Sequence, residues 1–247
     1  MSKAVIIGCS SGIGKALALL LSSQGYQLGL AGRNVSLMAE VKEQTRNSSH
    51  LIQFLDLTQT EESIKSIQFL FEKMGEVDLV IINSGVGYAN PELDWLTEKH
   101  IIDVNVLGFV SMAAWIFKYF QKRGKGHMVG ISSIAGIRGA WHVPSYNASK
   151  SFVSNYLEGL RCKALYLKLP IIVTDIRPGF VLTPMIEGRK DLFWAATAEK
   201  AAHQIYCAIQ KKKNCVYVTR RWRLIGWVLK WIPEWIYFPF MLRAKRA

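Results

Sequence analysis

A glycine-rich turn between a short apolar strand and a helix is the feature that most restricts how this chain can fold. Residues 4–7 are apolar, the turn Gly8-Cys9-Ser10-Ser11-Gly12-Ile13-Gly14 follows at once, and from 13 to 21 apolar residues recur at helical spacing. Glycines are needed where a chain turns sharply and where backbone N–H groups approach a pyrophosphate at the positive end of a helix. The turn therefore predicts a binding site for the phosphates of a nucleotide.

Strands and helices alternate along most of the remaining chain. Apolar runs predict strands at residues 27–31, 51–55, 77–82, 127–132, 171–176 and 215–218, and helical periodicity predicts helices near 36–45, 61–74, 102–121, 145–168 and 198–211. Because the connections are short, this order implies right-handed crossovers and a doubly wound parallel α/β sheet, a Rossmann fold, of about seven strands. No repeat or internal linker is visible, so we expect one domain at 1–218 and a C-terminal tail at 219–247.

The ends of the strands offer residues that suit a dinucleotide. Sites of this type usually bind the adenosine ribose at the end of the second strand, through an acid for a free 2′-hydroxyl or an arginine for a 2′-phosphate. Here Arg33 follows that strand, and no acid occurs before Glu40 in the next helix. Lys15, just after the glycine turn, could supply a second cation. The pattern favours NADP over NAD, although a solvated Arg33 and a solvated Lys15 remain the alternatives.

Tyr146 and Lys150 form a candidate catalytic pair. They are four residues apart at the start of a predicted helix, so both side chains lie on one face. A nearby ammonium stabilises phenolate over phenol, which would lower the pKa of Tyr146 toward that of a working acid–base. Ser133 comes thirteen residues earlier at the end of a predicted strand, where its hydroxyl could hold a substrate oxygen. By itself the pair is weak evidence, because Tyr-x-x-x-Lys occurs on many solvated helices.

With these motifs in this order, residues 3–218 resemble a short-chain dehydrogenase/reductase of the short, single-domain subtype. The motifs that carry the resemblance are the glycine turn, Asp56-Leu57, Asn83-Ser84-Gly85, Asn105, Ser133, Tyr146-x-x-x-Lys150 and Pro178-Gly179-x-x-x-Thr183. Two positions depart from the family pattern. Ile7 replaces a threonine that usually precedes the turn, and Ser84 stands where alanine is commoner.

The resemblance implies a role for each matched residue. Tyr146 would be the acid–base, Ser133 would polarise the carbonyl, Lys150 would hold the nicotinamide ribose, and Asn105 would anchor a water relay to Lys150. Residues expected at the cofactor, besides Tyr146 and Lys150, are Gly8, Ser10, Ser11, Gly12, Ile13, Gly14, Lys15, Arg33, Asp56, Leu57, Asn83, Gly85, Pro178, Gly179, Val181 and Thr183. Among them, Asp56 would reach the adenine amino group, and Val181 and Thr183 the nicotinamide carboxamide.

The expected activity is NADPH-dependent reduction of a ketone or aldehyde. The segments after Ser133 and Thr183 should wall the substrate pocket, and they offer a large apolar lining: Ile137, Trp141, His142, Met185, Phe193 and Trp194. That lining suggests a hydrophobic, lipid-like, acyl, steroid-like or prenyl-linked substrate. Two alternatives stay open: a nucleotide-sugar epimerase or dehydratase, which usually has a larger C-terminal domain, and a catalytically idle NADP-binding sensor or scaffold. We also expect a homo-oligomer, either a dimer or a tetramer.

Positive charge is concentrated in the tail. The chain carries a net charge of +13, and residues 211–247 hold ten Lys or Arg, one acid and four of the eight tryptophans. On a helix, one side would present Leu224, Trp227, Val228, Trp231 and Trp235, with Arg223, Gly226 and Lys230 as a narrow polar stripe. Lys230, Pro233, Glu234 and Pro239 interrupt the apolar run, so we do not expect it to span a membrane.

The tail composition predicts contact with an anionic membrane surface, where Trp and basic residues are favourable. Packing over the chain's own substrate pocket, or a subunit contact, is the alternative. Nucleic acid is not expected, because the charges adjoin an almost continuous apolar run. Cys9, Cys162, Cys207 and Cys215 follow no metal-ligand spacing, so no metal is expected and a reducing compartment fits best. The apolar strand begins directly after Lys3, which leaves no room for a signal peptide and favours a cytoplasmic or peripheral membrane location.

Overall fold

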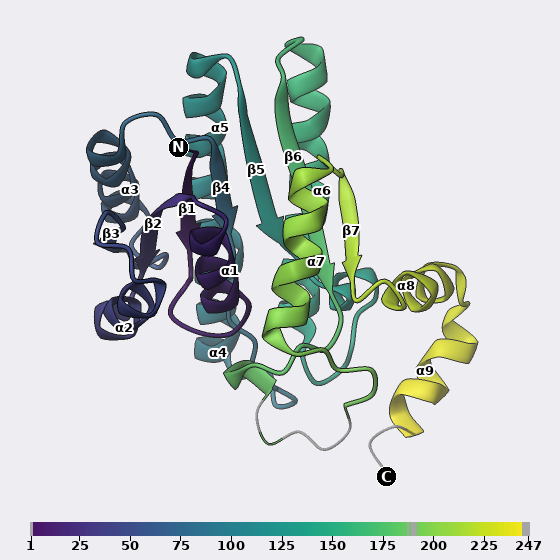
Figure 1. Cartoon of the computed structure of the whole chain (residues 1–247). Helices are drawn as coiled ribbons and strands as arrows, with labels where there is room; N and C mark the ends of the chain where they lie inside the picture. Colours follow the sequence, from purple (N-terminus) through teal and green to yellow (C-terminus); the bar gives the residue numbers. More distant parts are fainter. Residues whose placement is uncertain (1, 187, 189–191, 244–247) are drawn as a thin grey trace.

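A single parallel sheet forms the middle layer of the molecule. The computed structural model describes residues 2–186, 188 and 192–243 (Figure 1). Among these, seven strands lie in the order β3-β2-β1-β4-β5-β6-β7, every neighbouring pair being parallel. Their bounds are β1 Lys3–Ile7, β2 Gln27–Gly32, β3 Leu51–Phe54, β4 Leu79–Ile82, β5 Gly126–Ile131, β6 Ile171–Pro178 and β7 Cys215–Val218. The predicted doubly wound sheet is confirmed.

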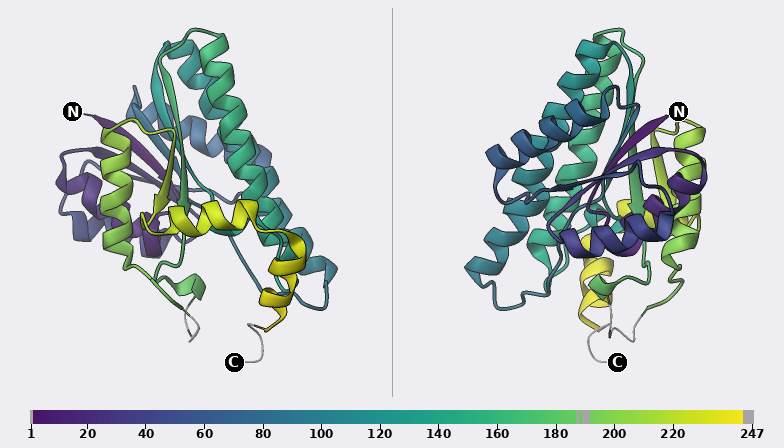
Figure 2. Two further views of the ribbon diagram at one scale, coloured as in Figure 1. Left: turned by 90° about the vertical axis from the view of Figure 1, so that its right-hand side faces the viewer. Right: turned by 60° about the vertical axis from the view of Figure 1, so that its left-hand side comes forward.

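Helices cover both faces of the sheet. Helices α1 (Gly12–Ser23), α2 (Val35–Thr45) and α7 (Ala198–Gln210) pack on one face. Helices α3 (Thr60–Met74), α5 (Phe109–Arg123) and α6 (Pro144–Tyr166) pack on the other (Figures 1 and 2). The remaining elements are α4 (Trp95–Ile102), α8 (Trp222–Trp231), α9 (Glu234–Arg243) and the short turns η1 (Asp103–Gly108), η2 (Ile134–Ile137) and η3 (Pro184–Ile186).

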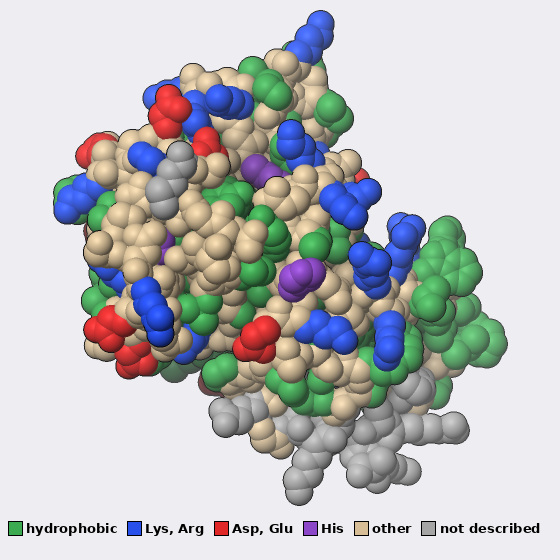
Figure 3. All heavy atoms as spheres, in the orientation of Figure 1, with side chains coloured by type: hydrophobic (Ala, Val, Ile, Leu, Met, Phe, Trp, Pro, Cys, Tyr) green, Lys and Arg blue, Asp and Glu red, His purple; other side chains and the backbone are tan. Residues whose placement is uncertain are grey.

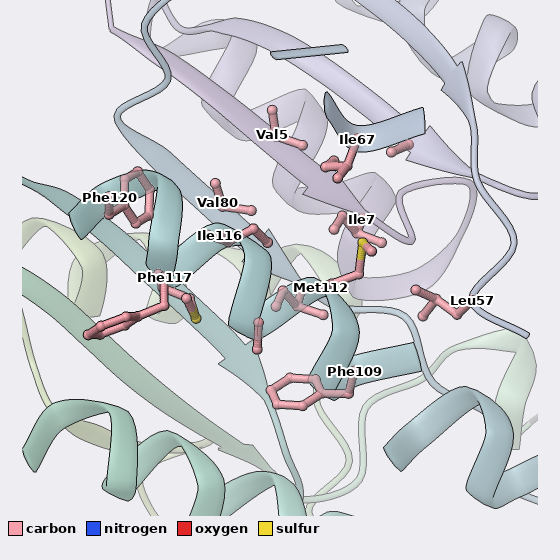
Figure 4. Packing of buried hydrophobic residues seen from close by; sticks show 14 of the residues in the cluster. Val5, Ile7, Leu57, Ile67, Val80, Phe109, Met112, Ile116, Phe117 and Phe120 are labelled. Carbon is pink, nitrogen blue, oxygen red and sulfur yellow. The ribbon is translucent and has the colours of Figure 1, made fainter. Parts of the chain in front are cut away.

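The two cores follow from the two-residue period of the strands. In β1, Val5 and Ile7 belong to the core beneath α3, α5 and α6, whereas Ala4 and Ile6 belong to the core beneath α1 and α7. Figure 4 shows Val5, Ile7 and Val80 in one buried cluster with Met112 and Ile116 of α5. Because both faces are covered, the strands are apolar throughout rather than alternating, as parallel strands in α/β proteins usually are.

The strand order reverses between β1 and β4, which is where α/β folds form a ligand crevice. From β1 the chain moves outward to β2 and β3, then returns to the other side of β1 to form β4. At such a reversal, ligands bind outside the carboxyl ends of the two neighbouring strands. The glycine turn after β1 and Asn83 after β4 therefore meet at this point.

The helix predicted at 102–121 differs from the observed one. Helical structure begins at Trp95, where the Asp94 side chain accepts a hydrogen bond from the Thr97 backbone N–H. It passes through the π-helical η1 before α5. The sequence missed α4 because Ile101 is its single buried residue, so apolar periodicity is weak there. The segment Trp95–Arg123 is long and apolar enough to cross a membrane, but half of its most apolar window is buried inside the protein.

The tail packs against the domain as two helices. α8 contacts η2 and the end of β7, and α9 follows after Pro233 (Figure 2). The Trp222 ring lies 5.4 Å from that of Phe180 and 5.0 Å from that of Phe193. Gly226 was expected in an exposed polar stripe, but it is buried, because the missing side chain lets α8 approach Tyr217 closely.

Candidate active site

The glycine turn is held in a conformation that side chains would obstruct. Gly8 has φ +89° and Gly12 has φ +54°, in the left-handed region that favours glycine. A Cβ built on Gly14 would lie 1.9 Å from the Gly8 carbonyl oxygen. The Gly8 N–H donates to Ala31 O on β2 at 2.8 Å, and Asn83 Nδ2 donates to Gly8 O at 2.6 Å. The turn is thus fixed by both strands that flank β1.

The start of α1 suits a pyrophosphate. Ser11, the N-cap residue, makes no side-chain hydrogen bond to the helix, and the first turn holds no acidic residue. The helix dipole and these amide groups favour an anion at this position. Within the turn, Ser10 is partly exposed and Ser11 is exposed, whereas Ile13 packs toward the core and Cys9 is fully buried. Burial raises the pKa of the Cys9 thiol to about 12, so this thiol stays protonated.

Arg33 lies at the end of β2, where the adenosine ribose is expected from the sequence. It directly follows β2 and is exposed, and none of the salt bridges found among the described residues involves it. The neighbouring Asn34 is committed to capping α2, since its Oδ1 accepts from Leu37 N at 3.0 Å. Lys15 is half-buried in the first turn of α1. Asp56 Oδ1 accepts from both Thr58 N and Oγ1 at 3.0 Å. Leu57, in contrast, turns its side chain into the core.

The three predicted catalytic groups come together at the carboxyl end of β5. Ser133, which follows β5, lies beside the Tyr146 phenol, and its hydroxyl lowers the pKa of that phenol. Lys150, one turn further along α6, places Nζ 5.9 Å from the centre of the Tyr146 ring and donates to Ile131 O at 3.1 Å. The Ser133 hydroxyl also accepts from Ala135 N at 3.1 Å. The phenol, the hydroxyl and the ammonium therefore share one small volume.

Asn105 is positioned by the π-helical segment η1. Its amide accepts from Val86 N at 2.8 Å and donates to Val86 O at 2.7 Å and to Ser149 Oγ at 3.0 Å. Such π-turns within helices are frequent at functional sites. Gly85 separates Asn105 from the lysine, because a Cβ there would lie 3.3 Å from Asn105 Oδ1 and 2.9 Å from Lys150 Nζ. Any side chain at Gly85 would fill the space beside the ammonium group.

Burial sets the protonation of the catalytic groups. Desolvation raises the pKa of Tyr146, and the hydrogen bond from Ser133 lowers it in part. The sequence predicted a Tyr146 pKa lowered by Lys150; that prediction is wrong, because burial raises the pKa and the opposing effect comes from Ser133. Burial lowers the pKa of Lys150 to about 8, while the charge of Asp175 opposes that shift. At neutral pH the phenol is therefore protonated and the lysine mostly charged.

The segment after β6 closes over the glycine turn. A Cβ on Gly12 would lie 2.9 Å from Thr183 Cγ2, so the loops after β1 and β6 touch. Val181 is buried and pairs with Ala196 in an isolated bridge. Gly179 donates its N–H to Val218 O at 2.6 Å and faces the tail, since a Cβ there would lie 2.1 Å from the Trp222 ring. Pro178 O lies 3.5 Å from the Ser133 hydroxyl.

Some residues predicted to wall the substrate pocket have other contacts. Phe193 and Trp194 join an aromatic cluster with Trp222 of the tail, although both remain half exposed. Ile137 faces Gly226 of α8. The His142 carbonyl accepts from Asn90 N at 2.7 Å, and its ring lies 5.3 Å from that of Trp141. This side of the site is therefore partly built from the tail, one of the alternatives that the sequence left open.

Two polar clusters near the site were not found from the sequence. Asp175 is fully buried, accepts a hydrogen bond from Ser132, and pairs with Arg177 at 2.7 Å. An aspartate inside the apolar run of β6 was the available signal. In the second cluster, Glu98 of α4 accepts a hydrogen bond from the hydroxyl of Ser145, the residue before Tyr146. That cluster could not be seen because α4 itself was not predicted.

Comparison with known proteins identifies the class to which this fold and site belong. Residues 2–191 match the family described as short chain dehydrogenase. An "Uncharacterized oxidoreductase" of Myxococcus xanthus is 34% identical over 182 residues, which cover 72% of this chain and 71% of that protein. The chain belongs to the short-chain dehydrogenase/reductase family. It is an oxidoreductase whose fold binds a nicotinamide cofactor.

Solved structures share the fold at low identity. The 3-ketoacyl-(acyl-carrier-protein) reductase of Brucella melitensis, complexed with NADH, superposes with a TM-score of 0.80 at 21% identity, covering 89% of this chain and 98% of that chain. An alcohol dehydrogenase of Thermococcus sibiricus, complexed with 5-hydroxy-NADP, gives 0.76 at 23% identity, covering 88% and 95%. Both types of nicotinamide cofactor therefore occur among these structures.

The glycine turn gives the first testable prediction. Gly14→Ala should weaken NADPH binding and lower the free energy of unfolding, because its Cβ would meet the backbone oxygen of Gly8. Gly159→Ala on α6 is the matched control, since a Cβ there meets nothing within 4 Å and should stabilise the helix by about 0.5–1 kcal/mol. Urea unfolding and cofactor fluorescence titration measure both effects. Unchanged NADPH affinity in Gly14→Ala would mean that the turn does not hold the phosphates.

The pKa of Lys150 predicts a pH dependence of stability. Between about 8, its folded value, and 10.5, its ordinary value, the unfolded chain holds a proton that the folded protein has released. Within that window this group makes the free energy of unfolding rise with pH. Lys150→Met should remove this contribution, whereas Lys163→Met, on the exposed side of the same helix, should keep the wild-type profile. Urea unfolding at a series of pH values between about 8 and 10.5 measures how the free energy of unfolding depends on pH. The same dependence in Lys150→Met and in the wild type would contradict a buried ammonium.

Proposed function

We propose that this protein is an NADPH-dependent reductase that transfers hydride to a ketone or aldehyde on a hydrophobic substrate. The convergence of Ser133, Tyr146 and the buried Lys150 at the carboxyl end of β5 is the observation that carries this proposal. The same constellation argues against a catalytically idle sensor, because a cofactor-binding scaffold has no need of a buried ammonium next to a phenol.

The residues of the chain would handle the oxygen and its proton. Bound NADPH supplies the hydride. The Ser133 hydroxyl donates a hydrogen bond to the carbonyl oxygen and thereby polarises it. Tyr146 then donates its proton to that oxygen, and its raised pKa ensures that the proton is present at neutral pH. The ammonium of Lys150 stabilises the phenolate that remains. The protonated phenol of Tyr146 is the form that can deliver a proton when the carbonyl is reduced.

The residues that follow β2 are the reason for proposing NADPH and not NADH as the cofactor. Arg33 is exposed there, while the Asn34 side chain is occupied in capping α2. A guanidinium group can bind a 2′-phosphate through two parallel hydrogen bonds. Lys15 in the first turn of α1 adds a second positive charge. A carboxylate that would prefer a free 2′-hydroxyl is missing between Arg33 and Glu40 in the sequence.

The substrate side of the site favours a hydrophobic molecule. Leu182 and Met185 in the segment after β6, and Trp141 in the loop before α6, are large apolar side chains with substantial exposure. Exposed apolar groups around a polar reacting centre suit a ligand that covers them and buries its own apolar surface. A cytoplasmic location, with the basic tail toward the membrane, follows from the proposed use of NADPH and from the charge of the tail.

Tyr146→Phe tests the chemistry. The variant should lose about 10²–10⁴-fold in turnover, since it lacks the proton donor, while NADPH affinity stays at the wild-type level. The measurement is NADPH oxidation with a panel of long-chain and aromatic ketones and aldehydes, beside fluorescence titration of the cofactor. Tyr166→Phe, at an exposed position of the same helix, serves as the control. Wild-type turnover in Tyr146→Phe would refute the role of the phenol.

The variant Arg33→Ala tests the proposed preference for NADPH over NADH. Loss of one charge-assisted contact, about 1.5–3 kcal/mol, should weaken NADPH binding about 10- to 100-fold. Binding of NADH, which has no 2′-phosphate, should change little, so the same variant supplies its own control. The two dissociation constants are measured by fluorescence titration. An equal loss for both cofactors, or no loss for either, would show that Arg33 does not recognise the phosphate.

A further inference from the structure

The outer face of the tail is held in place by the domain. Trp222 and Gly226 form the inner face of α8, against Phe180 and Tyr217. α9 is fixed by Tyr237, whose hydroxyl donates to Gly139 O at 2.7 Å. Arg138 donates to Ile232 O at 2.9 Å and stacks its guanidinium 4.6 Å from the centre of the Tyr237 ring. The side chains that face away from these contacts therefore have a defined arrangement.

That outer face is apolar and unusually exposed. Trp227, Trp231 and Trp235 are 66%, 69% and 76% exposed, which is far more than tryptophan normally shows. The other large apolar side chains exposed on the two helices are Leu224, Val228, Ile236, Phe238 and Leu242. Figure 3 shows apolar side chains gathered at the right-hand edge of the molecule, over α8. We call the eight residues the tail face.

Positive charges border the tail face. At the helical repeat, Arg223 and Lys230 lie along one side of the apolar residues of α8, and Arg221 lies near the other side. All three are exposed, and Lys and Arg side chains adjoin the apolar group in Figure 3. Glu234 is the only acidic residue between positions 211 and 247. The arrangement is complementary to a surface that is apolar inside and negatively charged at its edge.

We infer that the tail face docks into the surface of an anionic lipid bilayer. Tryptophan is favoured at the boundary between head groups and acyl chains, and each cation near an anionic surface adds to binding. A second copy of the chain fits less well, because two tail faces in contact would bring their arginines and lysines together. Nucleic acid fits less well too, because its phosphates would meet the apolar centre of the face instead of cations.

Docking would bring the substrate side of the site close to the bilayer. The loop before α6 is tied to the tail through Arg138 and Gly139, and Phe193 and Trp194 of the segment after β6 contact Trp222. These two segments flank Ser133 and Tyr146. A hydrophobic molecule dissolved in the membrane would therefore have a short route to the site. The docking itself does not depend on the proposed reaction and is tested without substrate.

The test is co-sedimentation of the full chain with vesicles of phosphatidylcholine alone or mixed with phosphatidylserine. The wild type should bind the mixed vesicles, more weakly at higher salt, and bind pure phosphatidylcholine poorly. The double variant Trp227→Ser/Trp231→Ser should lower the partition coefficient by about tenfold or more. Arg223→Gln/Lys230→Gln should lower it on the order of tenfold for the mixed vesicles only.

Leu165→Ser/Tyr166→Ser is the matched control, because these α6 side chains are 79% and 84% exposed and lie outside the tail. It should bind as the wild type does. The proposal is overturned if the wild type ignores both kinds of vesicle, if it binds both equally, or if the tryptophan variant binds as well as the control. It is also overturned if light scattering shows a wild-type oligomer that the tryptophan variant loses, without any vesicle binding. Melting temperatures of all variants confirm that these exposed substitutions leave the fold intact.

Discussion

A buried ammonium group is the constraint around which the site is built. Lys150 is 5% exposed, donates to Ile131 O, and has its charge balanced in part by the buried Asp175. Such a charge is costly to desolvate, so the structure must surround it with polar atoms and leave room for it. Gly85 provides that room beside the ammonium. Gly136 lets η2 pack directly on the α6 backbone, since a Cβ there would lie 2.7 Å from the Lys150 carbonyl carbon.

The sheet supplies the positions that this arrangement needs. The glycine turn, Asn83 and Ser133 all come from the carboxyl ends of neighbouring strands β1, β4 and β5. Parallel strands end at one edge, so residues distant in sequence arrive at one crevice without any special folding of the loops. The π-turn in η1 then turns Asn105 toward Val86 and Ser149, next to the lysine.

The parallel sheet and most of the candidate site residues could be predicted from the sequence. The features that could not be predicted depend on how distant segments pack together. The strands are short apolar runs that alternate with helices, so a parallel sheet of about seven strands could be predicted, whereas the order of the strands in the sheet was not. Tyr146 and Lys150 were found because helical spacing fixes which residues share a face. The raised pKa of Tyr146 was missed because burial depends on distant segments that no local pattern reveals.

The same dependence on segments distant in sequence explains why the burial of Asp175 and the packing of the tail were not predicted. Arg177 lies two residues after Asp175 on the same strand and so on the same face, but the Ser132 hydroxyl became a partner of Asp175 only through the register of β5 and β6. In the tail, the amphipathic pattern predicted an apolar side. It could not show that Gly226 would face inward against Tyr217, or that Trp222 would pack on Gly179 at the end of β6.

The central claim is that Ser133, Tyr146 and Lys150 surround the reacting end of a bound nicotinamide. A crystal structure of the complex with NADP⁺ tests it most directly. The account predicts the pyrophosphate at the amide groups that open α1, the 2′-phosphate at Arg33, and the ribose of the nicotinamide at Lys150. The nicotinamide ring should leave space for a carbonyl within about 3–3.5 Å of the Tyr146 hydroxyl. A ring bound away from Tyr146, or a cofactor that avoids the crevice between β1 and β4, would contradict it.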